Sequence, residues 1–386
     1  MIDCIDNPIF YGSELSFDEL PEEKRAALLQ PNGDWLFRIH APEAQTVDVL
    51  PWLGDPSPEG YAPWRDQWIH LTRGEDGTFT GVLPYANWKS GCRNVEIYID
   101  GVFVIWPYLP VLWSGGFLHN CLEIADEDMT FSYPRSDIPH GAVTHEYYFS
   151  SVTGRLERCL VYTPPGYMNG TERSPVLYLQ HGGGENETSW YSSGKINWIM
   201  DNLLAAGKCV PMLVVMNNGM VRYPENVGTG IMDDCFERSL LSCCIPHIDS
   251  HYRTLTDKWH RAIAGLSMGS MQTNDIGFKH PDVFGNMGSF TSTMYHDTFK
   301  TTYERPWPRV MANPEQFMRD YKVFFCSATP QEDHLPLFLT DEKIMREAGI
   351  EGKMPGYRRV VHDPRMTRWN SWRMGLAEYA TMLFRD

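Results

Sequence analysis

The chain has 386 residues, of which 42% are apolar and 13% aromatic, so it has material for packed cores and room for two domains. Its 33 basic residues do not cluster and are outnumbered by 49 acidic ones, and the formal charge of −16 argues against nucleic acid or anionic membranes as partners. The N-terminus lacks the basic and apolar regions of a secretory signal, and no apolar run reaches the length of a membrane span. We therefore expect a cytoplasmic protein.

The first 130 residues predict a short helix followed by a small antiparallel β-sandwich of the immunoglobulin-like kind. Residues 15–29 have an acidic opening and an end rich in Ala and Leu, which is typical of a short helix. Later segments alternate apolar and polar residues with the two-residue period of half-buried strands, at 35–40, 77–83 and 94–99. Asp100-Gly101 directly follows the last of these and is a strong hairpin signal.

A second domain is expected over residues 131–386, and a Pro-containing linker at 133–139 lies at its start. Short apolar runs there predict strands at 160–162, 176–179, 212–216, 262–264, 323–326 and 359–361. Between and after them, helices are expected at 196–206, 234–253, 268–280, 341–348 and 369–384. This alternation predicts an α/β domain with a mostly parallel central sheet that is buried on both faces. Such sheets carry catalytic groups at the carboxyl ends of their strands.

A G-x-S-x-G motif at residues 265–269 lies between an expected strand and an expected helix. In this context the motif predicts a nucleophile elbow, a sharp turn whose glycines relieve crowding so that the serine Oγ stands clear of the sheet. Ser267 is therefore the candidate nucleophile. The alternative is an ordinary glycine-rich turn without chemistry.

A second glycine-rich segment, His181-Gly182-Gly183-Gly184, follows the strand expected at 176–179. In the same class of site, the backbone N–H groups of such a loop join the N–H of the residue after the serine to form an oxyanion hole. We expect Gly183, Gly184 and Met268 to supply these donors. The order of the two motifs favours this interpretation over a chance glycine-rich turn.

A catalytic triad needs an acid and a histidine after the serine. The loop after the strand expected at 323–326 carries Asp333, our first choice for the acid, and Glu332, our second. Only two histidines follow Asp333 in the sequence. His334 is the next residue in the same loop, and His362 lies after the strand expected at 359–361. Either could be a solvated surface residue instead.

From Asp137 onward the chain resembles the feruloyl-esterase-like carbohydrate esterases of family 1 and the related enterochelin-esterase-like α/β-hydrolases. The resemblance rests on residues 139–141, 148–154, 161–167, 177–185 and 264–269, which include both glycine-rich motifs. It covers about 250 residues. Residues 37–42 and 98–102 more loosely resemble the early-set, immunoglobulin-like domain that often precedes these esterases and looks like a carbohydrate-binding module.

The chain departs from this family at the catalytic base. In the family, a Pro-Gly-Gly-His-x-Trp loop carries the basic histidine, and a final helix then reads Trp-x-x-Trp-Arg. Aligned on Pro364, Trp369 and Trp372, this chain has Thr367 at the histidine position. A threonine hydroxyl cannot accept a proton near neutral pH and return it as an imidazole does.

Three interpretations follow from Thr367. In the first, His362 or, less favoured, His334 replaces the missing base, and the protein is a working serine esterase. In the second, the chain is a degenerate hydrolase that binds an acylated or glycosylated ligand with little turnover. In the third, the altered base marks acyl transfer or a lyase step on the same scaffold.

The resemblance and the positions of the motifs suggest which residues line the substrate cleft. These are His181, Glu185, Arg222, Thr291, Trp307 and Thr367. Trp307 lies between the elbow and the acid, in a segment that often forms a lid, where its ring could stack on a phenolic or sugar ring.

We therefore predict an α/β-hydrolase preceded by a β-sandwich, acting through Ser267 on an acylated carbohydrate or phenolic ester. The expected partner is a small-molecule or oligosaccharide ester, and a homo-oligomer is compatible with the sequence. The chemistry implies no metal and no organic cofactor.

Overall fold

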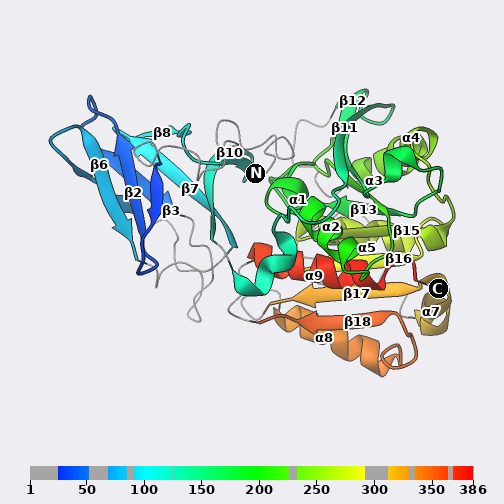
Figure 1. Cartoon of the computed structure of the whole chain (residues 1–386). Coiled ribbons are helices and arrows are strands. Elements are labelled where there is room, and N and C mark those ends of the chain that lie inside the picture. Colours follow the sequence, from blue (N-terminus) through cyan, green and yellow to red (C-terminus); the bar gives the residue numbers. More distant parts are fainter. Residues whose placement is uncertain are drawn as a thin grey trace. The chain divides into compact units, whose positions relative to one another are not determined.

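The computed structural model describes residues 25–51, 68–84, 91–124, 126–225, 233–291, 312–329, 335–363 and 368–385. The chain divides into two compact units (Figure 1). The first contains Met1–Thr130 with Pro364–Asn370, and the second contains Phe131–Asp363 with Ser371–Asp386. In the part of the chain that is described, no helix is long and apolar enough to cross a lipid bilayer.

Two sheets form the first unit. One has the strand order β1(Ala27–Leu29), β2(Trp35–His40), β6(Thr78–Leu83), β5(Thr72–Arg73). The other has the order β4(Ile69–His70), β3(Val47–Pro51), β7(Gly91–Ile99), β10(Phe117–Ile124), β9(Val111–Ser114), and β8(Val102–Val104) pairs with β7. Buried side chains from both sheets, such as Phe37, Phe79 and Ile97, share one hydrophobic core. The predicted small β-rich unit is thus confirmed.

The hairpin predicted at Asp100-Gly101 joins β7 to β8, with Ile99 opposite Val102. Both turn residues have positive φ, 49° and 76°, as a two-residue hairpin of this kind requires. The Asp100 carboxylate also accepts hydrogen bonds from the backbone N–H groups of Gln45 and Thr46. These contacts fix the turn against the neighbouring loop.

The helix expected at 15–29 is wrong at its C-terminal end, because residues 27–29 form strand β1. Ala27 and Leu28 pair antiparallel with Phe37 and Leu36, and Ala27 is fully buried. Pairing with β2 and burial in the sandwich therefore override the local helix propensity of Ala and Leu. Residues 15–24 lie outside the described residues.

The second unit is built on an eight-stranded sheet. Its order is β11(Ala142–Ser150), β12(Arg155–Thr163), β14(Leu213–Asn217), β13(Val176–Gln180), β15(Arg261–Leu266), β16(Asn286–Phe290), β17(Val323–Ala328), β18(Tyr357–Val361). The strands from β14 to β18 in this order are parallel, while β11 and β12 pair antiparallel at one edge. The predicted α/β-hydrolase fold is confirmed. The sequence did not identify β11 and β16 as strands.

The described helices of the second unit are α1(Ser189–Ser192), α2(Ile196–Ala205), α3(Cys235–Ser239), α4(Ile245–His251), α5(Met268–Lys279), α7(Pro314–Asp320), α8(Leu335–Glu347) and α9(Arg368–Met382), whose first residues belong to the first unit. A π-helical turn, η7(Leu240–Cys244), joins α3 to α4. The single helix expected at 234–253 therefore consists of three consecutive helical segments, with the π-helical turn in the middle. Short 3-10 turns lie at η5(Glu127–Ser132), η6(Tyr167–Asn169) and η8(Lys258–His260). Helix α7 was not predicted.

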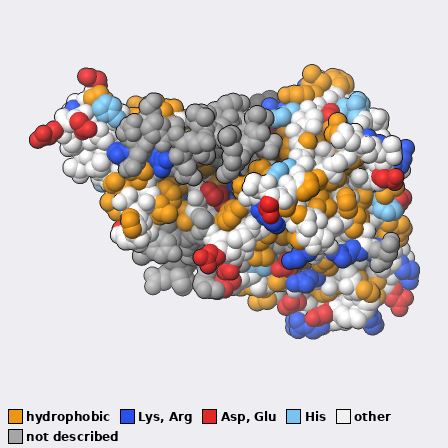
Figure 2. All heavy atoms as spheres, in the orientation of Figure 1, with side chains coloured by type: hydrophobic (Ala, Val, Ile, Leu, Met, Phe, Trp, Pro, Cys, Tyr) orange, Lys and Arg blue, Asp and Glu red, His pale blue; other side chains and the backbone are white. Residues whose placement is uncertain are grey.

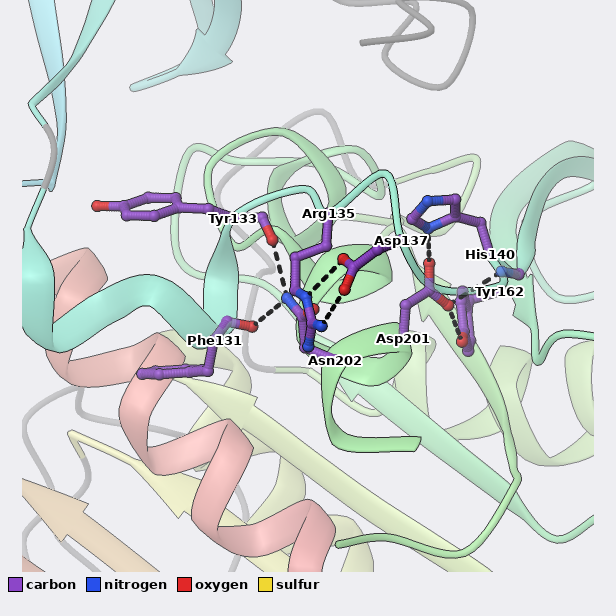
Figure 3. A network of polar contacts seen from close by, with 9 residues as sticks. Phe131, Tyr133, Arg135, Asp137, His140, Tyr162, Asp201 and Asn202 are labelled. Carbon is purple, nitrogen blue, oxygen red and sulfur yellow. Dashed lines mark hydrogen bonds and ion pairs between the residues drawn. The ribbon is translucent and has the colours of Figure 1, made fainter. Parts of the chain in front are cut away.

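The segment that opens the second unit is held on α2 by a network of polar contacts (Figure 3). The buried Asp201 carboxylate accepts hydrogen bonds from the Tyr162 hydroxyl at 2.6 Å and the Gly141 N–H at 2.9 Å, and lies 3.0 Å from His140 Nδ1. The neighbouring Asn202 donates to the carbonyl oxygens of residues 131 and 133. The segment 131–141, which contains the linker expected at 133–139, is therefore held on α2 at several points.

We predict that Asp201→Ala will lower the free energy of unfolding by about 2–4 kcal/mol, because it leaves buried donors without their acceptor. Asp137 in the same network is the matched control, since its ion pair with Arg135 is exposed to solvent. Asp137→Ala should leave the urea midpoint nearly unchanged. Equal midpoints for wild type and Asp201→Ala in urea unfolding would show that the network does not stabilise the fold.

Candidate active site

Ser267 occupies the turn between β15 and α5, with φ 49° and ψ −118°. A positive φ is strained for a residue with a side chain and persists only where the surroundings enforce it. Ser267 is exposed, whereas Leu266 and Met268 on either side are buried. The turn thus presents the serine side chain to solvent at the carboxyl end of β15.

The two glycines of the motif allow this turn because no side chain would fit at either position. A Cβ on Gly265 would lie 2.5 Å from the carbonyl of Gly269. A Cβ on Gly269 would lie 2.5 Å from the carbonyl oxygen of His181. Helix α5 can therefore begin in direct contact with the end of β13, which brings the two glycine-rich motifs together.

The loop after β13 borders the serine. A Cβ built on Gly182 would lie 3.5 Å from Ser267 Cβ, and one on Gly183 would lie 4.0 Å from Met268 Cβ. Met268 is the first residue of α5, and N–H groups in the first turn of a helix have no acceptor within the helix. The backbone of Gly182 and Gly183 and the start of α5 thus lie close to Ser267.

His181 is buried and is hydrogen-bonded to this loop. Its Nε2 accepts a hydrogen bond from the Gly219 N–H at 2.9 Å, so the proton is on Nδ1, which lies 2.7 Å from the Gly182 carbonyl oxygen. Burial lowers the pKa of His181 to about 4. The ring is therefore neutral near pH 7, and its lone pair is already used, so it orients the loop rather than accepting a proton.

Glu185 also contacts the backbone of this loop. Its Oε2 accepts a hydrogen bond from the Gly182 N–H at 2.9 Å. Burial raises the pKa of Glu185 to about 7, and the hydrogen bond from Gly182 partly opposes that rise. The carboxyl group of Glu185 therefore keeps its proton to a higher pH than an exposed glutamate does.

Thr291 follows β16 and lies beside the elbow. Ser270 Oγ donates to the Ser267 carbonyl oxygen at 2.6 Å and also approaches the Thr291 carbonyl oxygen at 3.3 Å. The buried Trp372 on α9 donates from Nε1 to Thr291 Oγ1 at 2.5 Å. The sequence did not assign Trp372 to the site, although its place in the Trp-x-x-Trp-Arg motif was a signal for it.

His362 follows β18 and is buried. Its backbone N–H donates to the Ala328 carbonyl oxygen, and its ring lies against α9. Nδ1 is 2.9 Å from Ser371 Oγ, and Nε2 is 3.6 Å from a carboxylate oxygen of Glu378. Contact with His362 lowers the pKa of Glu378. To accept a proton from Ser267, the ring would have to leave these two neighbours, so the assignment of His362 as the base stays a prediction.

A second histidine–carboxylate pair, His140 with Asp201, lies away from the serine (Figure 3). Asp201 contacts Tyr162, which is paired with Val214 near the start of β14. Ser267 follows the end of β15, which is parallel to β13 and β14. The pair thus lies at the amino ends of the parallel strands, whereas Ser267 lies at their carboxyl ends, so the pair cannot accept a proton from the serine.

The remaining candidates are only partly described. Glu332, Asp333, His334, Trp307 and Thr367 lie outside the described residues. Arg222 is half-buried in the segment after β14, three residues beyond the glycine that bonds His181. Across the described ranges, no group of three or more His, Cys, Asp or Glu side chains could hold a metal ion.

Comparison with known proteins identifies the family. Residues 150–373 match the model of the Esterase family, described as "Putative esterase". The chain is also 36% identical over 274 residues to an endo-1,4-beta-xylanase/feruloyl esterase of Xylanibacter ruminicola. That match covers 69% of this chain and spans 36% of the length of the relative.

Solved structures share the fold. A ferulic acid esterase from Anaeromyces mucronatus, in complex with ferulic acid, superposes with a TM-score of 0.52 at 18% identity, covering 67% of this chain and 96% of that chain. The enterobactin esterase of Shigella flexneri, in the presence of enterobactin, gives a TM-score of 0.59 at 14% identity, covering 90% of this chain and 92% of that chain. At these identities the likeness shows the fold alone.

We predict that Gly269→Ala will lower the free energy of unfolding by about 2–4 kcal/mol, because the new methyl group meets a backbone carbonyl that cannot move freely. Gly277 in the same helix is the matched control. A Cβ there would meet the flexible side chain of Met287 at 2.5 Å, which can shift. Urea unfolding that shows equal losses for Gly269→Ala and Gly277→Ala would contradict the close contact between α5 and the loop.

We also predict that the raised pKa of Glu185 lowers the free energy of unfolding as the pH rises. Its folded pKa of about 7 lies above the usual 4.5, so between these values the folded state holds a proton that the unfolded state has lost. The contribution is therefore complete below about pH 4.5 and is lost as the pH rises towards 7. Glu185→Gln should flatten the fall of the urea midpoint between pH 5 and 8, whereas Glu172→Gln, at an exposed position, should not. An unchanged slope in Glu185→Gln would refute this role.

Proposed function

The chain belongs to the Esterase family, and we propose that it is a serine ester hydrolase acting on an acylated carbohydrate or a phenolic, feruloyl-type ester. The observation that carries the proposal is the exposed Ser267 in a strained strand-to-helix turn, bordered by the glycine loop after β13. A serine held in this way is suited to attack a carbonyl carbon. The relative named as a feruloyl esterase supports this substrate class.

In the proposed mechanism, Ser267 Oγ attacks the ester carbonyl and loses its proton to a base. The carbonyl oxygen becomes an oxyanion, which accepts hydrogen bonds from the backbone N–H groups of Met268, Gly183 and Gly184. The base returns its proton to the departing alcohol, which leaves an acyl group on Ser267. Water then attacks the acyl group by the same route and releases the acid. These steps use no metal and no organic cofactor.

The proton acceptor is proposed to be His362 or His334, oriented by Asp333 or Glu332. His362 would have to turn from Ser371 and Glu378 towards the elbow, whereas His334 directly follows the proposed acid in the chain. Thr367, at the family's histidine position, would line the cleft. Trp307, Arg222 and Glu185 would contact the substrate or its surroundings, with Trp307 stacking on its ring.

A second candidate function is binding without efficient turnover. The observation that favours it is the threonine at the family's histidine position, together with the contacts that hold the His362 ring on α9. Loss of one triad member leaves only the catalysis that the oxyanion hole and substrate binding provide. Such a protein would still hold an acylated or glycosylated ligand beside Ser267.

We predict that Ser267→Ala will lower kcat/KM for methyl ferulate by at least about a thousandfold, because it removes the nucleophile. One of the variants His362→Ala and His334→Ala should lose activity to a similar degree and thereby name the base. His251→Ala, which changes an exposed histidine on α4, is the control and should keep full activity. If folded wild type turns over no ester, the binding function is favoured instead.

A further inference from the structure

The β11–β12 hairpin exposes large apolar side chains on one face. Tyr147, Phe149 and Leu156 are 57%, 64% and 67% exposed. Phe149 is opposite Leu156 and Tyr147 is opposite Arg158 in the ladder, so the four side chains share one face, which we call the hairpin surface. Figure 2 shows hydrophobic side chains gathered over β11 and β12 at the top of the second unit.

The other face of the same hairpin is an ordinary buried face. Tyr148, Ser150 and Glu157 are buried there, and Ser150 Oγ lies 3.0 Å from Ser239 Oγ of α3. The hairpin therefore already has a packed side that holds it in place. Exposed apolar side chains that form a contiguous patch on a soluble domain mark a binding surface more often than a packing defect.

The hairpin surface projects past the sheet edge at which Ser267 stands. Cys159 of β12 is opposite Asn217, the last residue of β14, so residues 155–158 extend beyond that strand's carboxyl end. Asn217 is aligned with Gln180 and through it with Gly265, two residues before the serine. Three strand spacings, roughly 14 Å, separate β12 from β15, and four, roughly 19 Å, separate β15 from β11, which carries Tyr147 and Phe149.

Two contacts connect the hairpin surface to the segments around the serine. Arg158 Nε lies 2.5 Å from a carboxylate oxygen of the buried Glu187, two residues after Glu185. At the hairpin tip, a Cβ on Gly154 would be 3.6 Å from Pro224, in the segment whose Gly219 bonds His181. The hairpin is thus in contact with both segments that flank the candidate active site.

We propose that the hairpin surface binds the carbohydrate part of the ester substrate, several bonds away from the ester that Ser267 attacks. This inference rests on the proposed function. A small alcohol group cannot extend from Ser267 across three to four strand spacings, whereas an oligosaccharide can. Sugar rings have apolar faces that stack on aromatic rings such as those of Tyr147 and Phe149, and hydroxyl groups that can accept hydrogen bonds from Arg158.

The test compares a long and a short ester of the same acid, a feruloylated arabinoxylan oligosaccharide and methyl ferulate. Tyr147→Ser combined with Phe149→Ser should raise KM for the oligosaccharide by about tenfold to a hundredfold, because two stacking rings are lost. Turnover of methyl ferulate should stay within about twofold, since the small ester does not reach the hairpin. Leu339→Ser is the matched control, because Leu339 is an exposed apolar residue on α8.

A binding measurement separates failure of this inference from failure of the proposed function. Titration of the same oligosaccharide into Ser267→Ala, with and without the two hairpin substitutions, needs no turnover. Weaker binding in the hairpin variant supports the inference even if the wild type hydrolyses nothing. Equal affinities in the titration, or equal KM values for the oligosaccharide, would overturn it. A dimer in wild type that becomes a monomer in the hairpin variant would also overturn it, because the surface would then bind a second copy of the chain.

Discussion

The contact between the start of α5 and the end of β13 constrains the whole candidate site. Gly269 lies so close to the His181 carbonyl that no side chain fits between them. Ser267 in the same turn has a positive φ of 49°, and a Cβ on Gly183 would lie 4.0 Å from Met268 Cβ. A turn of this kind stores backbone strain that the surrounding packing must offset. The exposed serine and the loop beside it are therefore consequences of one close approach of backbone to backbone.

Two polar side chains that contact the glycine loop, His181 and Glu185, are both uncharged over a range of pH. Burial keeps His181 neutral above about pH 4 and keeps Glu185 protonated below about pH 7. Each side chain is hydrogen-bonded to the backbone of the loop, at Gly182. In the proposed mechanism this uncharged surrounding would favour the oxyanion, because no negative side chain then opposes the charge that develops on the carbonyl oxygen. Above this range the ionised Glu185 would oppose it.

The sequence predicted those parts of the molecule whose signal is local. Alternation identified β2, continuous apolar runs identified β13 and β15, and the two glycine motifs identified Ser267 and its loop. The local sequence pattern was misleading for residues 27–29, where pairing with β2 decides the structure. Strand β16 was missed because Asn, Gly and Ser interrupt its apolar pattern. The contact of Trp372 with Thr291 joins residues 81 positions apart, so only the folded chain reveals it.

The reaction of Ser267 with a fluorophosphonate tests directly whether this serine is an activated nucleophile. Intact-mass measurement followed by peptide mapping, with Ser267→Ala as the control, reports both the stoichiometry and the position of the adduct. We expect one adduct per chain, located on Ser267 and absent in the variant. A folded wild type that remains unlabelled, or that is labelled at another residue, would contradict it.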